Sequence, residues 1–119
     1  WYQVTDQGAR EGNYLESSAT ALFIYTLAKA VNKGYIGKDY IQPTRKAFDG
    51  MVKTFTRLEE DGSYTITNCC AVAGLGGDSK RYRDGSFEYY ISEPVIENDP
   101  KSVGSFILAA IEYEKMTDK

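Results

Sequence analysis

The chain of 119 residues contains no histidine, two cysteines and one tryptophan. Without histidine it lacks the usual general base and the commonest zinc ligand, so acid–base chemistry would fall to carboxylates, tyrosine or lysine. Cys69 and Cys70 are neighbours, and neighbouring cysteines rarely bridge each other because the short ring strains the peptide. We expect two small buried hydrophobic side chains there; a redox or metal pair is the alternative, but it lacks the spacing of such sites. No metal or cofactor is expected.

Long apolar runs and an excess of positive charge are also missing. The longest apolar run, 19–31, is interrupted by Thr20, Thr26 and Lys29, and a membrane helix needs about 20 apolar residues. The net charge is -3, and the dense basic cluster at 80–83 is flanked by aspartates. Nucleic-acid binding needs lysine and arginine gathered on one face. We therefore expect neither a membrane nor a nucleic acid as partner.

The chain starts with Trp1 and has no basic region followed by an apolar core, the pattern of a signal peptide. We expect a processed product or a fragment, so its location stays open between the cytoplasm and the periplasm of a bacterium. Hydrophobic residues make up 42% and charged residues 26%. That balance and the length are typical of a single globular domain.

The first predicted helix runs from about residue 14 to 33, with apolar residues such as Leu22 and Phe23 at helical spacing. Asn13 is expected to cap it, with Glu16 completing a capping box, and Gly34 to end it. Between residues 19 and 31 the only charge is Lys29, so we expect this helix to be buried on most sides.

Two further helices are predicted. One, amphipathic with one face in water, runs from about residue 38 to 55; because proline is tolerated only in the first turn, Pro43 favours a start after residue 38. The other begins near Pro100, is capped by Asp99 and ends near Lys115. Its predicted buried face consists of Val103, Phe106, Ile107, Ala110 and Ile111.

The segment from 57 to 100 has a different character. Asp61-Gly62 indicates a hairpin turn, residues 63–67 alternate as a short strand does, and residues 87–91 fit either a strand or a turn of helix. The glycines at 74–77 lack the Lys-Ser or Lys-Thr of a phosphate loop. A mainly helical fold with a hairpin and long loop before the last helix follows, arranged as a double ring of helices or as a plain helical bundle.

Four strings decide between these arrangements. They are WYQV at 1–4, GNYLESSA at 12–19, VAGLG at 72–76 and YRDGSFEYYISEP at 82–94, which Asn98-Asp99 follows. In this order they resemble the carboxyl-terminal region of the unsaturated rhamnogalacturonyl hydrolases, glycoside hydrolase family 105, and of the related unsaturated glucuronyl hydrolases.

The resemblance implies an (α/α)6 fold, in which six helical hairpins form a double toroid. Residues 1–119 would be a single domain, the carboxyl-terminal third of that toroid, with the first and third helices in the inner ring and the second in the outer ring. Because a ring segment exposes two apolar edges, it would associate with itself or with the missing amino-terminal part.

The resemblance also implies a reaction, the removal of an unsaturated galacturonyl residue from rhamnogalacturonan (pectin) oligosaccharides made by a lyase. In that family an aspartic acid protonates the vinyl-ether carbon, water adds at the neighbouring carbon, and the hemiketal collapses to release the remaining sugar; paired-carboxylate glycosidases work differently. The family's catalytic aspartate and histidine lie upstream of the matched region, so no catalytic residue is expected here and the chain alone would be inactive. The alternative is a non-catalytic helical domain that binds a saccharide or a partner.

Six residues are candidate contacts for the unsaturated oligosaccharide. An anionic sugar needs a cation or hydroxyl donors; arginine binds a carboxylate through two parallel hydrogen bonds, aromatic faces stack on sugar rings, and amides hold hydroxyls. Packing onto the helices is the alternative for the aromatic residues. The candidates are Trp1, Gln3, Arg83, Ser86, Tyr89 and Tyr90.

Three carboxylates receive structural interpretations. Asp84 and Glu88 are four residues apart and resemble an acid–base pair, but we interpret Asp84-Gly85 as a turn and Arg83 and Glu88 as members of ordinary ion pairs. Glu16 would point toward the pocket mouth of a ring, although a helix cap is the simpler account.

Overall fold

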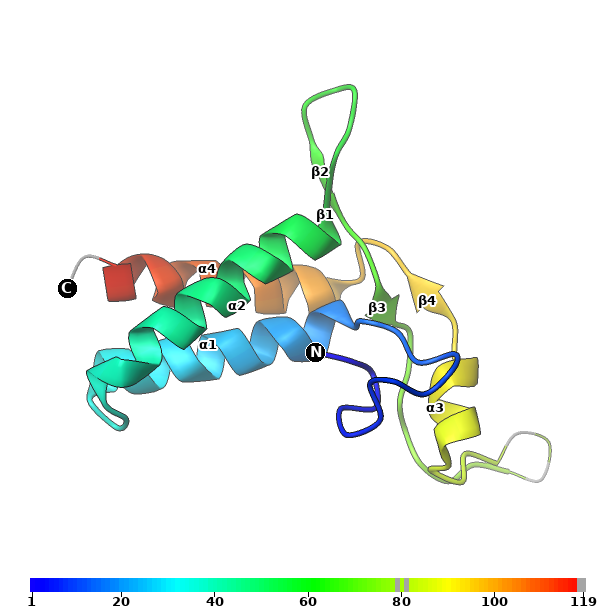
Figure 1. Ribbon diagram of the computed structural model, residues 1–119. Helices are drawn as coiled ribbons and strands as arrows, with labels where there is room; N and C mark the ends of the chain where they lie inside the picture. The colour runs from blue at the N-terminus through cyan, green and yellow to red at the C-terminus, as the bar shows by residue number, and fades with distance from the viewer. Residues whose placement is uncertain (79, 81, 118–119) are drawn as a thin grey trace.

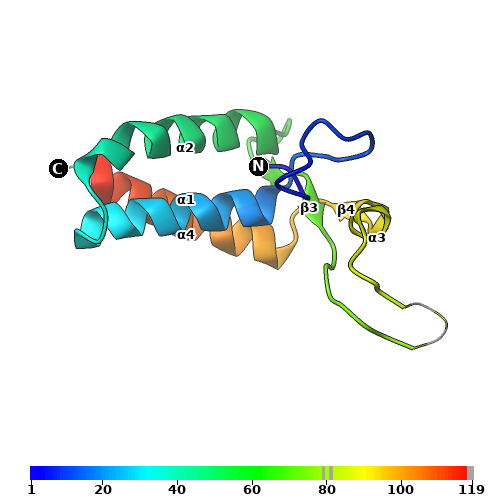
Figure 2. The ribbon, with the colours of Figure 1, turned by 60° about the horizontal axis from the view of Figure 1, so that its bottom comes forward.

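A computed structural model of the chain describes residues 1–78, 80 and 82–117. Three long helices, α1 (Ser17–Lys33), α2 (Ile41–Phe55) and α4 (Pro100–Thr117), lie side by side in Figure 1 and again after the rotation in Figure 2. α1 and α4 run in the same direction and α2 runs against them. The 3₁₀ turn η1 (Lys38–Tyr40) leads into α2, so the fold is mainly helical, as predicted.

The remaining elements are short. β1 (Thr56–Leu58) and β2 (Tyr64–Ile66) form an antiparallel hairpin with Thr56 opposite Ile66. β3 (Cys69–Cys70) pairs antiparallel with β4 (Val95–Ile96), and α3 (Phe87–Ser92) lies between them in the sequence. The hairpin and the helical choice for residues 87–91 are thereby confirmed, whereas β1, β3 and β4 were not predicted.

α1 begins later than predicted, and Asn13 is not its cap. The side chain of Asn13 instead binds Val4, with its Nδ2 donating to the Val4 oxygen at 2.9 Å. Leu15 forms an isolated bridge with Tyr2, which holds the backbone extended, so the helix starts only at Ser17 with Glu16 as its cap. A contact with a distant segment therefore overrides the local capping signal.

The other helix boundaries agree with the sequence rules. Gly34 ends α1 in the left-handed region at φ 71°, where a side chain would be strained. α2 starts at Ile41, which puts Pro43 in its first turn. α4 starts at Pro100, and Asp99 Oδ1 accepts a hydrogen bond of 2.8 Å from the Lys101 nitrogen.

The centre of the unit is sealed by small and apolar side chains. α1 packs more extensively against α4 than against α2, because small buried residues allow a close approach of two helices. The core consists of Ala21, Ile24, Met51, Phe55 and Ala109, and Phe48 stacks on Tyr113 with ring centroids 4.0 Å apart. Ala28, Ser102 and Ser105 are also buried.

The flanks of α1 and α4 are open, contrary to the predicted burial. Leu22 is 46% and Phe23 41% exposed on α1, and Ile107 is 54% and Ile111 44% exposed on α4. Their helical spacing is as predicted, but nothing among the described residues covers these side chains. An apolar stripe looks the same in sequence whether its cover is present or absent.

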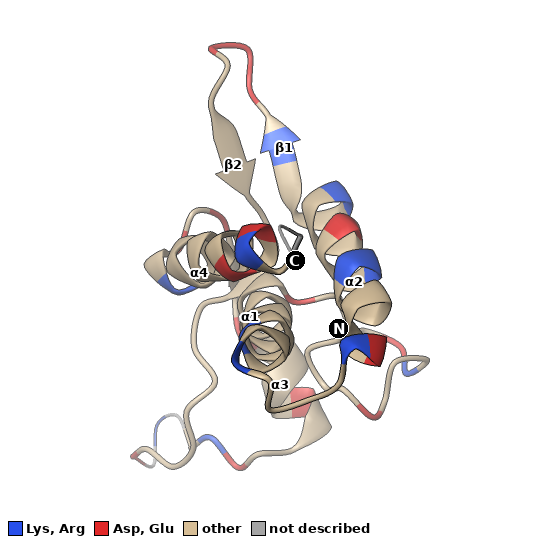
Figure 3. Ribbon diagram, turned by 90° about the vertical axis from the view of Figure 1, so that its left-hand side faces the viewer, with Lys and Arg blue, Asp and Glu red and all other residues tan. Residues whose placement is uncertain are grey.

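Charge is mixed over the outer surface. Basic and acidic positions follow one another along α2, and acidic residues occupy the outer tip of the β1–β2 hairpin (Figure 3). Among the described residues, no helix has the length and hydropathy needed to cross a bilayer.

Candidate functional site

The connecting segments gather at one end of the helical unit, where α1 and α4 begin and α2 ends (Figures 1 and 2). We call this the loop end; it consists of residues 1–16 and 67–99 as far as they are described. The opposite end carries the turn between α1 and α2 and the carboxyl terminus of α4. The loop end thus brings all six candidate sugar contacts to one side of the molecule.

Ser86 and Asp84 build the start of α3. Ser86 Oγ accepts a hydrogen bond of 3.1 Å from the Tyr89 nitrogen, which makes Ser86 the helix cap. Asp84 Oδ1 accepts one of 2.9 Å from the Ser86 nitrogen, and this bond lowers the pKa of Asp84. Gly85 sits between them at φ 77°. The interpretation of Asp84-Gly85 as a turn is confirmed.

Tyr89 and Tyr90 lie together on α3. Their ring centroids are 4.9 Å apart at an interplanar angle of 49°. The Tyr89 hydroxyl donates to the Gly74 oxygen at 2.5 Å, which fastens α3 to the preceding loop. Desolvation and the neighbouring Glu93 carboxylate raise the pKa of Tyr89, so its hydroxyl stays protonated and able to donate at neutral pH.

Arg83 is paired with a buried carboxylate. Its Nε donates to Glu93 Oε1 at 3.2 Å, and Glu93 is 3% exposed. The Arg83 backbone also bridges to Gly76, with N–H···O bonds of 2.8 and 2.9 Å in both directions. The ion pair with Glu93 runs through Nε of Arg83, and the Arg83 side chain is 27% exposed. Arg83 is therefore oriented on one edge and able to bind an anion on the other.

Arg10 holds the amino-terminal loop against α3. Its guanidinium carbon lies 3.8 Å from the centroid of the Phe87 ring, and its Nη2 pairs with Glu88. Nη1 donates to Gln7 Oε1 at 2.8 Å within the same loop. Glu88 is thus in an ordinary ion pair, as predicted, although Arg10 was not predicted to be its partner.

Trp1 and Gln3 face different surroundings. The Trp1 ring meets Phe23 edge-on at 5.2 Å and borders an open apolar pocket of about 580 Å³ beside α1. Gln3 Nε2 donates to Cys70 Sγ at 3.3 Å. Gln3 therefore contacts the root of the loop that carries Arg83, whereas Trp1 packs on the flank of α1.

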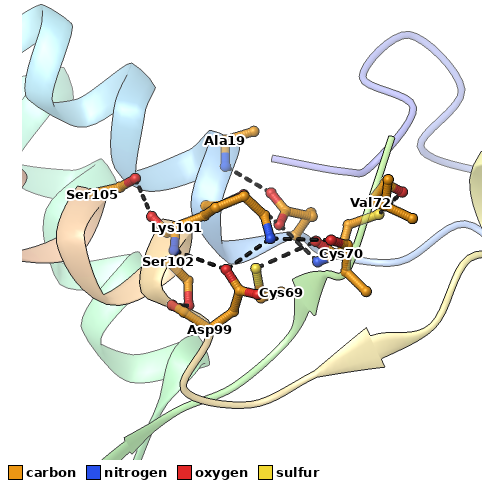
Figure 4. A network of polar contacts seen from close by, with 11 residues as sticks. Ala19, Cys69, Cys70, Val72, Asp99, Lys101, Ser102 and Ser105 are labelled. Atoms are coloured by element: carbon orange, nitrogen blue, oxygen red, sulfur yellow. Dashed lines mark hydrogen bonds and ion pairs between the residues drawn. The ribbon is translucent and has the colours of Figure 1, made fainter. Parts of the chain in front are cut away.

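β3 is fastened between the starts of two helices. The Cys70 nitrogen donates to Glu16 Oε1 at 3.0 Å, from the side of α1. Lys101 Nζ reaches from α4 to the Ala71 oxygen at 3.1 Å and to Asp99 Oδ1 at 2.7 Å (Figure 4). The loop that carries Arg83 and Tyr89 starts directly after this anchored segment.

The two cysteines are free and buried, as predicted. Burial raises the pKa of Cys69, which keeps it as a thiol of low reactivity. In the described residues, no group of three or more acidic or thiol side chains is arranged to hold a metal ion.

Comparison with known proteins supplies the decisive observation. Residues 1–117 match the family described as Glycosyl Hydrolase Family 88. The chain belongs to this family. The chain is similar to Protein Atu3128 of Agrobacterium fabrum and to the 24.9 kDa protein in picA locus of Rhizobium radiobacter, each 39% identical over 116 residues that make up 94% of this chain.

A solved structure extends the likeness to a named glycoside hydrolase. It is described as a structural analysis of the C. acetobutylicum ATCC 824 glycoside hydrolase from family 105. The two chains are 46% identical with a TM-score of 0.92, over 96% of this chain and 31% of that one. This family 88 chain also spans 50% of the length of the two curated relatives.

Several contacts that shape the loop end of this family 88 chain were not predicted from the sequence. Glu93 as the partner of Arg83, Arg10 on Phe87 and Lys101 on Ala71 join segments far apart in the chain. A single sequence carries no signal for such pairings. Substrate contact by the six candidates remains a prediction, since their positions alone do not test it.

Proposed function

We propose that the chain is part of an (α/α)6 glycoside hydrolase that removes unsaturated galacturonyl residues from lyase-generated rhamnogalacturonan oligosaccharides. The observation that carries this proposal is the 46% identity and TM-score of 0.92 to a family 105 glycoside hydrolase. The strings at 12–19 and 82–94, two of the four that carry the resemblance, both contribute to the loop end.

The open flanks support the ring. We propose that residues 1–119 are a single domain, the carboxyl-terminal third of the toroid, with α1 and α4 in the inner ring and α2 in the outer ring. One open edge is the pocket of Trp1, Phe23 and Leu27, and the other is the stripe of Ile107 and Ile111. Exposed apolar surfaces of this kind mark sites where another segment packs. We propose that the amino-terminal part of the toroid covers these edges, and that the chain associates with itself when that part is absent.

The loop end fits an anionic sugar. Two Nη donors on Arg83 suit a uronic carboxylate, which accepts parallel hydrogen bonds from one guanidinium. Tyr89 and Tyr90 offer ring faces and hydroxyls beside it. In this proposal Ser86 and Gln3 hold sugar hydroxyls, and Trp1 stacks on a ring at the rim.

The catalytic acid is proposed to lie outside this chain. Of the carboxylates near Arg83, Asp84 accepts a turn hydrogen bond, Glu88 pairs with Arg10, and Glu93 is buried against Arg83. Asp84 and Glu88 are exposed, but each accepts a hydrogen bond or pairs with a cation, which favours the ionised carboxylate over a proton donor. In the complete site an aspartic acid would protonate the vinyl-ether carbon, water would add at the neighbouring carbon, and the hemiketal would collapse. This chain would bind and orient the uronic acid.

The test uses an unsaturated galacturonyl-rhamnose disaccharide. The chain alone should bind it without turnover, so that the ultraviolet absorbance of the double bond persists. Adding the amino-terminal part of a family 105 relative should restore turnover. Steady turnover by the chain alone would show that the acid is present in it.

Binding has its own variant and control. Arg83→Met should abolish binding because it removes the proposed carboxylate contact. Arg57→Met breaks the exposed ion pairs of Arg57 on β1 with Glu59 and with Glu97, which follows β4, and should leave binding unchanged. Equal binding by both variants would contradict the proposed site.

A second function has its own support. The described residues contain candidate sugar contacts and open apolar edges but no placed acid, which also suits a non-catalytic helical domain that binds a saccharide or a partner. Binding of the disaccharide without any restored turnover, whatever part is added, would favour this alternative.

A further inference from the structure

Glu16 is an unusual helix cap. It is 1% exposed, and its carboxylate interacts electrostatically with the positive charge of the Trp1 amino group. Burying a carboxylate is costly unless donors surround it. Helix caps are normally serine, threonine, aspartate or asparagine, whose side chains are just long enough to reach the first helical N–H groups. A longer side chain at this position therefore suggests a second task.

The three donors to Glu16 come from two different elements. Oε2 accepts from the Ala19 nitrogen at 2.7 Å, which is the capping bond to α1. Oε1 accepts from Ser18 Oγ at 2.7 Å and from the Cys70 nitrogen at 3.0 Å. The last bond leaves the helix and reaches β3, so one carboxylate joins the start of α1 to the strand.

The position of Cys70 explains why β3 needs this acceptor. Along β3 the backbone N–H groups alternate between two edges. The Ala71 nitrogen points to the β4 side and donates to the Pro94 oxygen at 2.9 Å, whereas the Cys70 nitrogen points away from β4. Cys70 is buried, so without Glu16 its N–H would have no hydrogen-bond acceptor, either from a strand or from water. The carboxylate takes the place of a neighbouring strand on that edge.

The candidate sugar contacts Gln3 and Tyr89 both depend on the position of Cys70. Gln3 Nε2 donates to Cys70 Sγ, and the Glu16 nitrogen donates to the Trp1 oxygen at 3.0 Å. On the other side the loop leaves β3 at Ala71 and reaches Gly74, whose oxygen accepts from the Tyr89 hydroxyl. A shift of Cys70 would therefore move Gln3 and the support of α3 together.

We propose that Glu16 is a positioning residue of the saccharide site, which acts by fixing β3 at Cys70 and through it Gln3 and the loop that supports Tyr89. The inference rests on the proposed function for what the site binds. The effect of Glu16 on the loop is independent of the proposed function. The two parts are therefore measured separately.

Two substitutions separate capping from positioning. Glu16→Asp keeps a carboxylate that caps α1 well but is one methylene too short for the Cys70 nitrogen. Glu16→Ser keeps a neutral cap of the same kind, so the design does not depend on the folding of a single variant. Glu112→Asp makes the same chemical change at the far end of the helices, where Glu112 accepts from Asn32 and Lys115, and serves as the control.

The first readout is amide hydrogen exchange in the labelled chain. Because a charge-assisted hydrogen bond contributes about 1.5–3 kcal/mol, exchange at the Cys70 amide should rise about tenfold or more in both Glu16 variants. The signals of residues 71–77 and of the Gln3 side-chain amide should shift, while the α1 amides keep their protection. The Glu112→Asp control should leave all of these unchanged. Unchanged Cys70 exchange, or effects confined to α1, would overturn the proposal and leave Glu16 as a cap.

The second readout is binding of the unsaturated galacturonyl-rhamnose disaccharide. Weaker binding by Glu16→Asp than by the wild type and the control would support the positioning role. Equal binding, together with raised Cys70 exchange, would reject that role and leave the proposed function intact. If the wild-type chain does not bind the disaccharide, the proposed substrate is wrong, and the exchange measurement still decides what Glu16 does to the loop.

Discussion

The helical unit and the loop end are held together in opposite ways. α1, α2 and α4 meet through buried apolar and small side chains such as Ala21, Ile24 and Ala109. The loop end relies on hydrogen bonds and ion pairs, among them those of Glu16, Arg83 and Arg10. Changes in the helices should therefore alter global stability, whereas changes in the loop end should alter local order and binding.

The largest effect is expected in the helical core. Ile24 is fully buried, so Ile24→Ala should lower the free energy of unfolding by about 2–5 kcal/mol through lost burial and a residual cavity. Urea unfolding followed by circular dichroism measures it. Leu22→Ala, two residues away on the open flank, should cost less than about 1 kcal/mol. If both variants lose the same free energy of unfolding, the centre and the flank do not differ in packing as proposed.

The cap of α4 joins the two regions and should have a smaller effect. Asp99→Ala removes the acceptor for the Lys101 nitrogen and the partner of its ammonium, and should cost about 1 kcal/mol. Asp49→Ala, on the exposed side of α2, is the control and should cost nothing. If thermal unfolding shows no difference between the two variants, Asp99 does not stabilise the start of α4.

A local effect is expected at the strap between the amino-terminal loop and α3. Arg10→Met removes the guanidinium from the Phe87 ring and from Glu88, a contact worth about 0.5–1 kcal/mol at an exposed site. Amide exchange in residues 87–92 should rise while exchange in α1 and α4 stays constant. Arg57→Met should affect only the β1–β2 hairpin and the residues around Glu97, with which Arg57 pairs. A global rise in exchange would mean that the loop end is not a separate local unit.

The smallest effect concerns pH. Hydrogen bonds lower the pKa of Asp84 and of Asp99 in the folded chain. A carboxyl whose folded pKa is depressed stabilises the fold above its ordinary pKa of about 4, and this contribution disappears as the pH falls through the folded value. Stability measured from pH 6 downward should therefore decline in the acid range. The double variant Asp84→Asn and Asp99→Asn should show a flatter decline, and an unchanged decline would remove these two groups as its cause.

Local rules in the sequence were sufficient for most helix boundaries. Gly34, Pro43 and Asp99-Pro100 act through their own backbone or a near neighbour, so their effects could be predicted. Asn13 failed as a cap because the bridge between Tyr2 and Leu15 holds the chain extended beyond it. The exposure of Ile107 was missed because periodicity records that a face is apolar and not what covers it.

The candidate site could be predicted only in part. The turn at Asp84-Gly85 was predicted from the residue types, whereas the cap by Ser86 was not predicted, because Ser86 was considered only as a sugar contact. The partners of Arg83 and Cys70 lie on other elements, and nothing local to these residues indicates Glu93 or Glu16. Contacts between segments that are far apart in the chain therefore could not be predicted from the sequence.

The central claim is that the open flanks of α1 and α4 are edges made to be covered, and light scattering combined with binding of an apolar dye tests it directly. The wild-type chain should self-associate or bind the dye. A double variant with Phe23→Ser and Ile111→Lys should be monomeric, bind less dye and keep its helical circular dichroism. If the wild-type chain is a monomer that binds no dye, and the double variant behaves in the same way, the proposal that this chain is a segment of a ring is wrong.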